Sequence, residues 1–137
     1  MKNLTQAYLT ELTYKIIGCC IEVHKVLGPG LLESIYVRAL QEEFRIQGIK
    51  FRSEFHVPIF YKEKELGCDL RCDFLVEDCI VLEIKAVTEF HDIHKAQTIN
   101  YMNILKIPKG ILINFNVMNI FKEGQKTFVN RYYSELL

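Results

Sequence analysis

Two β-like runs flank a short turn within RCDFLVEDCIVLEIKA, residues 71–86, and their charged residues stand at alternate positions. The odd positions hold Arg71, Asp73, Glu83 and Lys85, whereas the even positions outside the turn are Cys, Phe, Val, Ile, Leu, Ile and Ala. Because successive strand residues point to opposite faces, this pattern predicts a β-hairpin with one apolar face and one charged face.

The register of this hairpin follows from the same alternation. Directly opposed residues of an antiparallel pair share a face, so a turn centred on Asp78 pairs Asp73 with Glu83 and Arg71 with Lys85. Moving the turn centre by one residue either way would change the partners but keep all four charges on one face. Like charges placed directly opposite one another are destabilising, so this arrangement needs an explanation.

Two explanations are open from the hairpin alone. On a solvated face, Arg71 could reach Glu83 diagonally and Asp73 could reach Lys85, each pair contributing about 0–1 kcal/mol. Alternatively, a divalent cation lies between Asp73 and Glu83 and relieves their repulsion. A hard cation such as Mg²⁺ prefers oxygen ligands and keeps several waters. Lys85 would then stand beside the metal, where it could orient or deprotonate a water or steady a phosphate oxygen.

Composition limits the classes of protein that fit. The chain has 137 residues, half of them apolar and 12% aromatic, which predicts one globular domain over residues 1–137. Lys and Arg together number 17, as do Asp and Glu, so the basic excess usual in nucleic-acid binders is absent. The N-terminus lacks the apolar region of a signal peptide, and no uncharged apolar run approaches a membrane-spanning length. Five irregularly spaced cysteines without a Cys-x-x-Cys pair favour a reducing cytoplasm over a zinc or iron–sulfur site.

The elements that must position the charged residues can be read along the chain. Apolar residues at three- and four-residue steps predict a helix that ends at Gly28, and a second helix is expected over 31–47. Pro58 lies inside an alternating run at 55–61, which favours an edge strand or a bulge. The remaining expected elements are a hairpin at 69–77 and 79–87, a helix at 94–105, a buried strand at 110–115, and a strand–turn–strand tail around 123–124. Helices on both faces of a mixed sheet would pack these elements.

Three motifs carry a resemblance to known nucleases. Asp73 followed by Glu83-Ile84-Lys85 resembles the active-site signature of the PD-(D/E)XK nuclease superfamily. The segment GLLESIY, residues 30–36, has a glycine, a glutamate and a tyrosine in the spacing that names the GxxExxY protein family. QTINY, residues 97–101, resembles the Gln-x-x-x-Tyr helix of exonuclease-type members.

The surrounding sequence is similar to the GxxExxY family as well. The similar segments are EVHKVLGPGLLESIY, VPIFYKEKELG, DFLVEDCIVLEIKAV and GILINF. The resemblance covers roughly residues 12–115 and thins over the last twenty. It implies an α/β, restriction-endonuclease-like core in the order helix, three strands, helix, strand (αβββαβ), with a mixed central sheet flanked by helices.

The resemblance also implies metal-dependent hydrolysis of phosphodiester bonds in nucleic acid, with DNA favoured over RNA. Mg²⁺ or Mn²⁺ would be held by Asp73, Glu83 and the Ile84 carbonyl. Lys85 would position the attacking water. Glu33 would assist the metal directly or through water.

Gln97 and Tyr101 share a helix face, where the resemblance implies that they position the substrate or hold Lys85. A purely structural role is also open for these residues and for the candidate residues of the helix expected over 31–47. Glu33 could merely complement a helix dipole, Tyr36 could pack in the core, and Gln97 with Tyr101 could form a polar stripe on an exposed helix.

Two rival functions keep the same fold. The first is a catalytically weak or inactive binding or regulatory module, favoured by the neutral net charge and by a length that leaves little room for a DNA-gripping arm. Against it, the acids and the lysine of the signature are all present. The second is a nuclease subunit that needs a protein partner or a second copy of the chain to complete its DNA surface.

Overall fold

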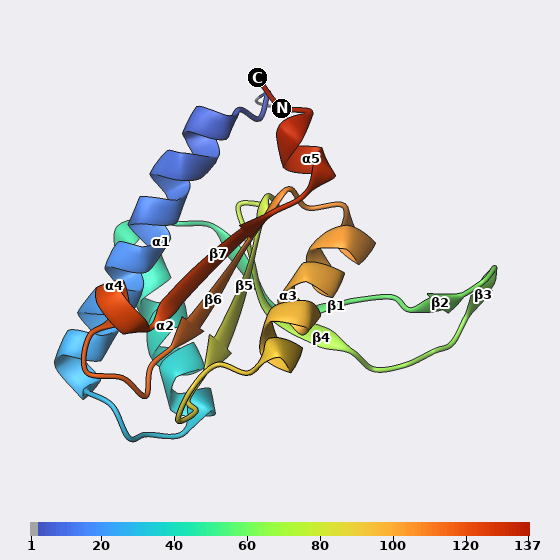
Figure 1. The fold of residues 1–137 in the computed structure, drawn as a ribbon. Coiled ribbons are helices and arrows are strands. Elements are labelled where there is room, and N and C mark those ends of the chain that lie inside the picture. The colour runs from blue at the N-terminus through green and yellow to red at the C-terminus, as the bar shows by residue number, and fades with distance from the viewer. Residues whose placement is uncertain (1–2) are drawn as a thin grey trace.

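A five-stranded mixed sheet carries helices on both of its faces in the computed structural model, which describes residues 3–137 (Figure 1). In chain order the elements are α1 (Gln6–Leu27), α2 (Glu33–Gln47), β1 (Phe51–His56), β2 (Phe60–Tyr61), β3 (Lys64–Glu65), β4 (Arg71–Val76), β5 (Ile80–Lys85), α3 (Asp92–Leu105), β6 (Lys109–Asn114), α4 (Ile120–Glu123), β7 (Gln125–Val129) and α5 (Arg131–Ser134).

The sheet has the strand order β1-β4-β5-β6-β7. Strands β5 and β6 are parallel and every other neighbouring pair is antiparallel. The connection between the parallel strands is α3, as parallel strands require a crossover. The sequence α2, β1, β4, β5, α3, β6 therefore confirms the predicted αβββαβ core, with one small ribbon inserted after β1.

Helices α1 and α2 cover one face of the sheet. The Thr5 hydroxyl accepts a hydrogen bond from the backbone N–H of Tyr8 and caps α1, while Gly48 ends α2 in the left-handed conformation that glycine adopts freely. The apolar stripes of both helices pack on alternate residues of the central strands. The fully buried members of this cluster include Leu9, Ile16, Leu40, Phe44, Phe74, Ile80, Leu82, Ile84 and Ile111.

Helix α3 covers the other face over a smaller cluster. Its buried members are Val57, Cys72, Leu75, Val81, Tyr101, Met102 and Ile107. Gly110 of β6 lets the helix approach closely, since a Cβ there would stand 2.5 Å from the Met102 sulfur. The hairpin face predicted to be charged is therefore half apolar: Leu75 and Val81 lie under α3, and the charges gather at one end.

The strict alternation expected along β4 breaks at Asp73. Phe74 packs beneath α1 and α2, whereas Cys72 packs beneath α3, so the two do not share the single apolar face that the pattern predicted. The neighbouring strand turns with β4, because Glu54 of β1 has a φ of 49° between Ser53 and Phe55. The alternation of faces is thus interrupted on both strands at the position where Asp73 lies.

Two further expectations are wrong in detail. The strand expected over 55–61 is two strands, interrupted at 57–59 around Pro58, which cannot donate to a ladder. The tail holds a short helix instead of the first strand of a hairpin. The Asn119 side chain accepts a hydrogen bond from the Lys122 N–H, and this cap starts α4 before the chain enters β7.

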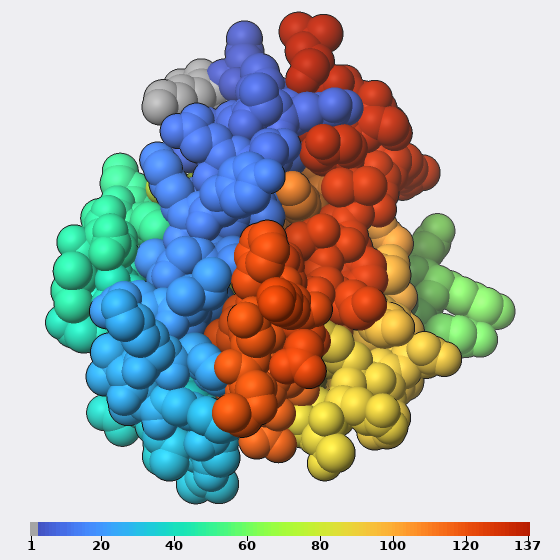
Figure 2. Space-filling model, turned by 60° about the vertical axis from the view of Figure 1, so that its left-hand side comes forward, coloured from blue at the N-terminus to red at the C-terminus, as the bar shows by residue number. Residues whose placement is uncertain are grey.

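The end of the chain returns to the start of α1. The backbone N–H of Gln6 donates to the carbonyl of Leu137 at 3.0 Å, and the Gln6 amide donates to the carbonyl of Tyr133 at 3.1 Å. Figure 2 shows α1 in blue lying against the orange and red C-terminal segment. The start of α1 and the last residues of the chain meet at the end of the sheet opposite to the C-terminal end of β5 (Figure 1).

The helices and the cysteines complete the description of the fold. Within residues 3–137, none of the helices is both long and apolar enough to cross a lipid bilayer. All five cysteines are free thiols; Cys68 is exposed, and the other four are buried.

Candidate active site

Asp73 and Glu83 meet in the gap where β4 and β5 separate. The strands pair through Phe74 and Leu82, which is the register predicted from a turn centred on Asp78. One residue further, the two strands are joined by hydrogen bonds to the Asp73 and Glu83 side chains and no longer by backbone hydrogen bonds to each other. The Asp73 N–H donates to Glu83 Oε2 at 2.6 Å, and the Ile84 N–H donates to Asp73 Oδ2 at 2.8 Å. Both carboxyl groups therefore lie between the two strands, and each binds the backbone opposite.

Burial and mutual repulsion dominate the electrostatics of this pair. Glu83 is only 3% exposed, and burial followed by the charge of Asp73 raises its pKa well above the usual range of a glutamate. Burial is also the main cause of the raised pKa of Asp73, to which the charge of Glu33 contributes. The pair has too little positive charge around it to ionise readily, which is the condition that a bound cation would relieve.

Lys85 supplies part of that positive charge. Its ammonium lowers the pKa of both Asp73 and Glu83, and it also contributes to lowering the pKa of His94, although partial burial is the larger cause there. Among the described residues, Lys85 forms no ion pair with either carboxylate. The amine therefore lies within electrostatic reach of the acids but keeps its hydrogen-bonding capacity for another group.

Glu33 is the first residue of α2 and stands near the pair. Its charge raises the pKa of both Asp73 and Glu83, so Glu33 lies within electrostatic reach of the pair. Across residues 3–137, however, no three His, Cys, Asp or Glu side chains are grouped closely enough to hold a metal ion. Asp73 and Glu83 thus meet in the gap, and Glu33 does not complete a group of three ligating side chains with them.

The tyrosine and the glycine of the GLLESIY segment both shape the loop before α2. Tyr36 is fully buried and stacks on Phe115, with ring centroids 4.5 Å apart. Its hydroxyl donates to the Gly28 carbonyl at 2.5 Å and accepts from the Leu31 N–H at 3.1 Å. Gly30 has a φ of 96°, which an L residue adopts only with strain. Tyr36 therefore stabilises the turn that precedes Glu33 and so helps to fix the position of Glu33.

Gln97 and Tyr101 lie on α3 above the same gap. Tyr101 is buried, and burial followed by the charge of Glu83 raises its pKa to about 12, while a side-chain hydrogen bond from Gln97 opposes the shift. Gln97 is half-buried. Tyr101 is thus enclosed in the core beneath α3, and Gln97 is the member of the pair that can reach a ligand.

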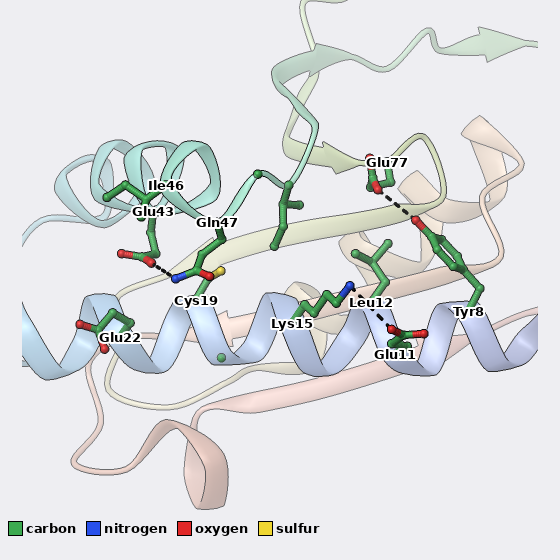
Figure 3. A pocket seen from close by; sticks show the side chains of 13 residues that line it. Tyr8, Glu11, Leu12, Lys15, Cys19, Glu22, Glu43, Ile46, Gln47 and Glu77 are labelled. Carbon is green, nitrogen blue, oxygen red and sulfur yellow. Dashed lines mark hydrogen bonds and ion pairs between the residues drawn. The ribbon is translucent and has the colours of Figure 1, made fainter.

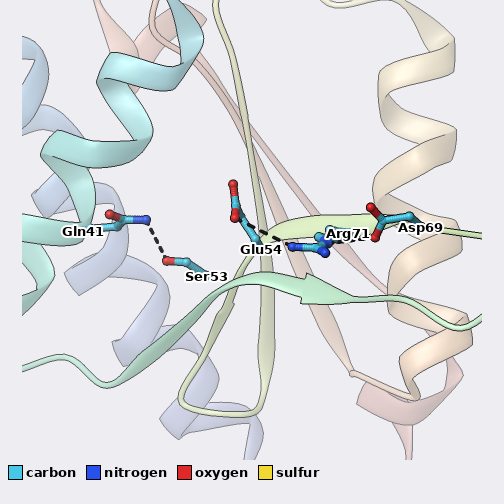
Figure 4. A network of polar contacts seen from close by, with 5 residues as sticks. All are labelled: Gln41, Ser53, Glu54, Asp69 and Arg71. Carbon is cyan, nitrogen blue, oxygen red and sulfur yellow. Dashed lines mark hydrogen bonds and ion pairs between the residues drawn. The ribbon is translucent and has the colours of Figure 1, made fainter.

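Glu54 belongs to the surroundings of the site and was not expected there. It lies opposite Asp73 in the β1–β4 ribbon, and its charge contributes to the raised pKa of Asp73. Arg71, on the charged face of the predicted hairpin, is engaged by acids: its Nε is 2.9 Å from Asp69 and its Nη1 is 4.0 Å from Glu54 (Figure 4). The only signal for Glu54 was an acidic residue in the segment before the expected strand.

Asn114 is the second residue that the sequence did not reveal. It ends β6 beside Lys85 and is only 2% exposed. Its Oδ1 accepts from the Val87 and Asn116 N–H groups at 3.0 Å, and its Nδ2 donates to the Val87 carbonyl at 2.8 Å. These bonds fix the chain immediately after Lys85. The sequence signal available for Asn114 was a polar residue within the apolar run GILINF.

A hollow of about 710 Å³ lies elsewhere, between α1 and α2 (Figure 3). Several of its carboxylates already have partners: Glu11 is 3.7 Å from Lys15, and Glu43 accepts from Gln47 at 2.8 Å. None of the residues predicted for the site lines this hollow. The residues expected from the sequence to carry out the chemistry therefore lie where β4 and β5 separate and not in this hollow.

Comparison with known proteins gives one family. Residues 10–128 match the model of the PD-(D/E)XK nuclease superfamily. The searches of curated proteins and of solved structures gave no significant match.

Proposed function

Because the chain belongs to the PD-(D/E)XK nuclease superfamily, we propose that it is a metal-dependent nuclease that hydrolyses phosphodiester bonds in nucleic acid, with DNA favoured over RNA. The observation that carries this proposal is the meeting of Asp73 and Glu83 in the gap between β4 and β5, with Lys85 two residues further along. A purely structural pair of acids would be expected to carry a direct ionic partner, and this pair has none among the described residues.

The donor set fits Mg²⁺ or Mn²⁺. Carboxylate and carbonyl oxygens are the ligands that such hard cations prefer. Asp73 and Glu83 each commit one oxygen to a backbone N–H and retain the other. The N–H and C=O of a strand residue point to the same side, so the Ile84 carbonyl faces the gap as its N–H does. These three groups would hold the ion, which when bound supplies an activated water and neutralises charge on the phosphate.

The chain's own side chains then divide the remaining work. Lys85 donates a hydrogen bond that orients the attacking water, and its charge stabilises the phosphate oxygens. Glu33 stands one step further out and holds a water at the site. Gln97 contacts the strand that is cleaved. Tyr101 acts through Gln97 as a positioning residue, because its own ring is buried.

We also propose that the chain is a GxxExxY protein within the superfamily. The support is that the three named residues of the motif serve one purpose here. Gly30 permits the turn, the Tyr36 hydroxyl ties that turn together, and Glu33 is thereby directed to the acidic pair.

The activity test uses purified protein with labelled single- and double-stranded DNA and RNA in the presence of Mg²⁺ or Mn²⁺. We expect cleavage that stops on chelation and falls by about 10²-fold or more in Asp73→Asn and in Lys85→Met. Asp78→Asn and Lys126→Met are the matched controls, since both residues are exposed and lie outside the site. Both controls should cleave as the wild type does.

Two results would reject the assignment. Cleavage that survives both Asp73→Asn and Lys85→Met would place the chemistry elsewhere. A wild-type protein that neither cleaves nor binds Mn²⁺ in a calorimetric titration would leave the inactive binding module as the function of this fold.

A further inference from the structure

A two-stranded arm extends from the ribbon that carries Asp73. Strands β2 and β3 form a separate small sheet that projects beyond the main one at the end of β1 and β4 (Figure 1). Its base is anchored: Val57 is fully buried beneath α3, and its N–H donates to the Leu70 carbonyl at 2.7 Å. The chain thus has the arm for which its length seemed to leave little room.

The end of the arm is exposed and has no core of its own. Phe60 and Tyr61 are 59% and 65% exposed, and Leu66 is 47% exposed. An isolated two-stranded ribbon is marginally stable in water, and aromatic side chains on it contribute little to the fold. These rings are therefore available to a ligand.

The two faces of the arm differ in charge. Tyr61 pairs with Lys64 and Phe60 pairs with Glu65, and opposed residues share a face. The Lys62 ammonium lies 5.6 Å from the centroid of the Tyr61 ring. Tyr61 therefore lies beside the Lys62 ammonium and shares a face with Lys64, whereas the opposite face carries Phe60 and Glu65.

We propose that the arm binds a single-stranded segment of nucleic acid leading to the site, with Tyr61 stacked on an unpaired base and Lys62 and Lys64 contacting phosphates. This inference rests on the proposed function, because the site suggests the ligand. Aromatic rings beside basic groups are the usual means of binding single strands without sequence preference. A base in a duplex has its faces covered, so a ring at the end of a narrow ribbon can stack only where bases are unpaired.

The position of the arm suits this role. Lys64 precedes Asp73 by nine positions along the chain. At about 3.3 Å per residue the end of the arm lies within roughly 30 Å of the acidic pair. A strand held at Tyr61 can therefore extend along the ribbon to the gap between β4 and β5.

The test measures binding, not cleavage. Fluorescein-labelled oligonucleotides, as single-stranded DNA, single-stranded RNA and duplex DNA of one sequence, are titrated with protein in EDTA and followed by fluorescence anisotropy. We expect Tyr61→Ala to raise the Kd for single strands at least about fivefold, and Tyr61→Phe to retain binding because the ring is kept. Tyr14→Ala, at an exposed tyrosine of α1, should bind as the wild type does.

The lysines are tested through the salt dependence. Lys62 has a φ of 56°, so Lys62→Gly removes the charge without straining the turn, and Lys64→Thr keeps a residue that suits a strand. Each lysine that no longer neutralises a phosphate should lower the slope of log Kd against log salt by about 0.7, hence by about 1.4 for the double variant. Lys126→Thr on β7 should leave the slope unchanged.

The outcomes separate this inference from the nuclease proposal. Asp73→Asn should lose cleavage and keep binding. If the wild type binds single strands through the arm but never cleaves, the inference stands and the nuclease proposal fails. If the arm variants bind as the wild type does, if the wild type binds no single strand, or if duplex is bound equally with the same dependence, the inference is overturned.

Discussion

At the residue scale, the site is two acids that the fold brings together against their mutual repulsion. Asp73 and Glu83 each accept one backbone N–H from the opposite strand, which secures their positions. Burial nevertheless raises the pKa of both, and Lys85 offsets this only in part. The folded chain without metal is therefore more stable when the pair holds a proton than when both acids are ionised.

This arrangement predicts how stability depends on pH. Raised pKa values mean that the folded state binds more protons than the unfolded chain, so the contribution of this pair to stability is fully present below about pH 4 and is lost as the pH rises toward 8. Glu83→Gln keeps an acceptor for the Asp73 N–H and removes the charge. We expect it to stabilise the metal-free protein at pH 8 by about 1–3 kcal/mol, measured by urea unfolding.

The control for this measurement is Glu65→Gln, which changes one exposed glutamate far from the pair. It should leave the pH profile as it is in the wild type. A wild type and a Glu83→Gln variant with parallel stability curves between pH 5 and 8 would show that the pair does not oppose ionisation.

The acids could be placed from sequence, whereas their neighbours could not. Alternation and a turn centred on Asp78 suffice to pair Asp73 with Glu83, because both signals are local. Glu54 reaches the site only through the pairing of β1 with β4 and a left-handed φ, and Asn114 only through the parallel pairing of β6 with β5. Neither long-range pairing leaves a local pattern.

At the element scale, the end of β5 is held by its parallel neighbour. Asn114 of β6 makes three hydrogen bonds to the backbone of residues 87 and 116, and it is buried. The connection from β5 to α3 therefore starts from a fixed point. Lys85 on one side and Gln97 on the other depend on that connection for their relative position.

Asn114→Ala should consequently weaken both the fold and the site. The variant leaves the Val87 N–H and C=O without their partner, and we expect a loss of about 2–4 kcal/mol in the free energy of unfolding, measured with urea. Asn100→Ala, at an exposed position of α3, should stay within about 0.5 kcal/mol of the wild type. A stability equal to that of the wild type in Asn114→Ala would contradict the role given to this side chain.

Long helices, in which the apolar repeat recurs over several turns, were predicted well, whereas short elements were not. Helix α1 has an apolar stripe over many turns together with a Thr5 cap, and α2 stops at Gly48. The four residues of α4 are too few to show a period, so their apolar members resembled a strand. The expected strand at 55–61 likewise concealed a break at Pro58, where the arm begins.

At the scale of the whole molecule, charge totals conceal how charge is arranged. The chain has as many basic as acidic residues. In the folded structure, however, Asp73 and Glu83 lie together between β4 and β5, and Lys62 and Lys64 lie on the arm with Tyr61. A neutral composition argued against a nucleic-acid partner only as long as the charges were taken to be evenly spread. Folding brings the acids together, so the unfolded chain lacks the proposed ion site.

A cation that binds only the folded chain must stabilise it by mass action. At a free Mn²⁺ concentration of about 100 times Kd, the stabilisation should be about 2.7 kcal/mol, detected as a higher midpoint in scanning calorimetry. Chelation should reverse it. Asp73→Asn should abolish it, and Asp78→Asn should not. An equal shift in all three proteins would indicate nonspecific binding of the ion.

The distribution of thiols gives the molecule a ready attachment point for a reporter. Burial raises the pKa of Cys19, Cys20, Cys72 and Cys79 and suppresses their reactive thiolates. Cys68 is exposed and lies where the chain returns from β3 to β4. A maleimide dye should therefore modify Cys68 first. Movements of the segment between β3 and β4 on ligand addition could then be followed by fluorescence without changing the sequence.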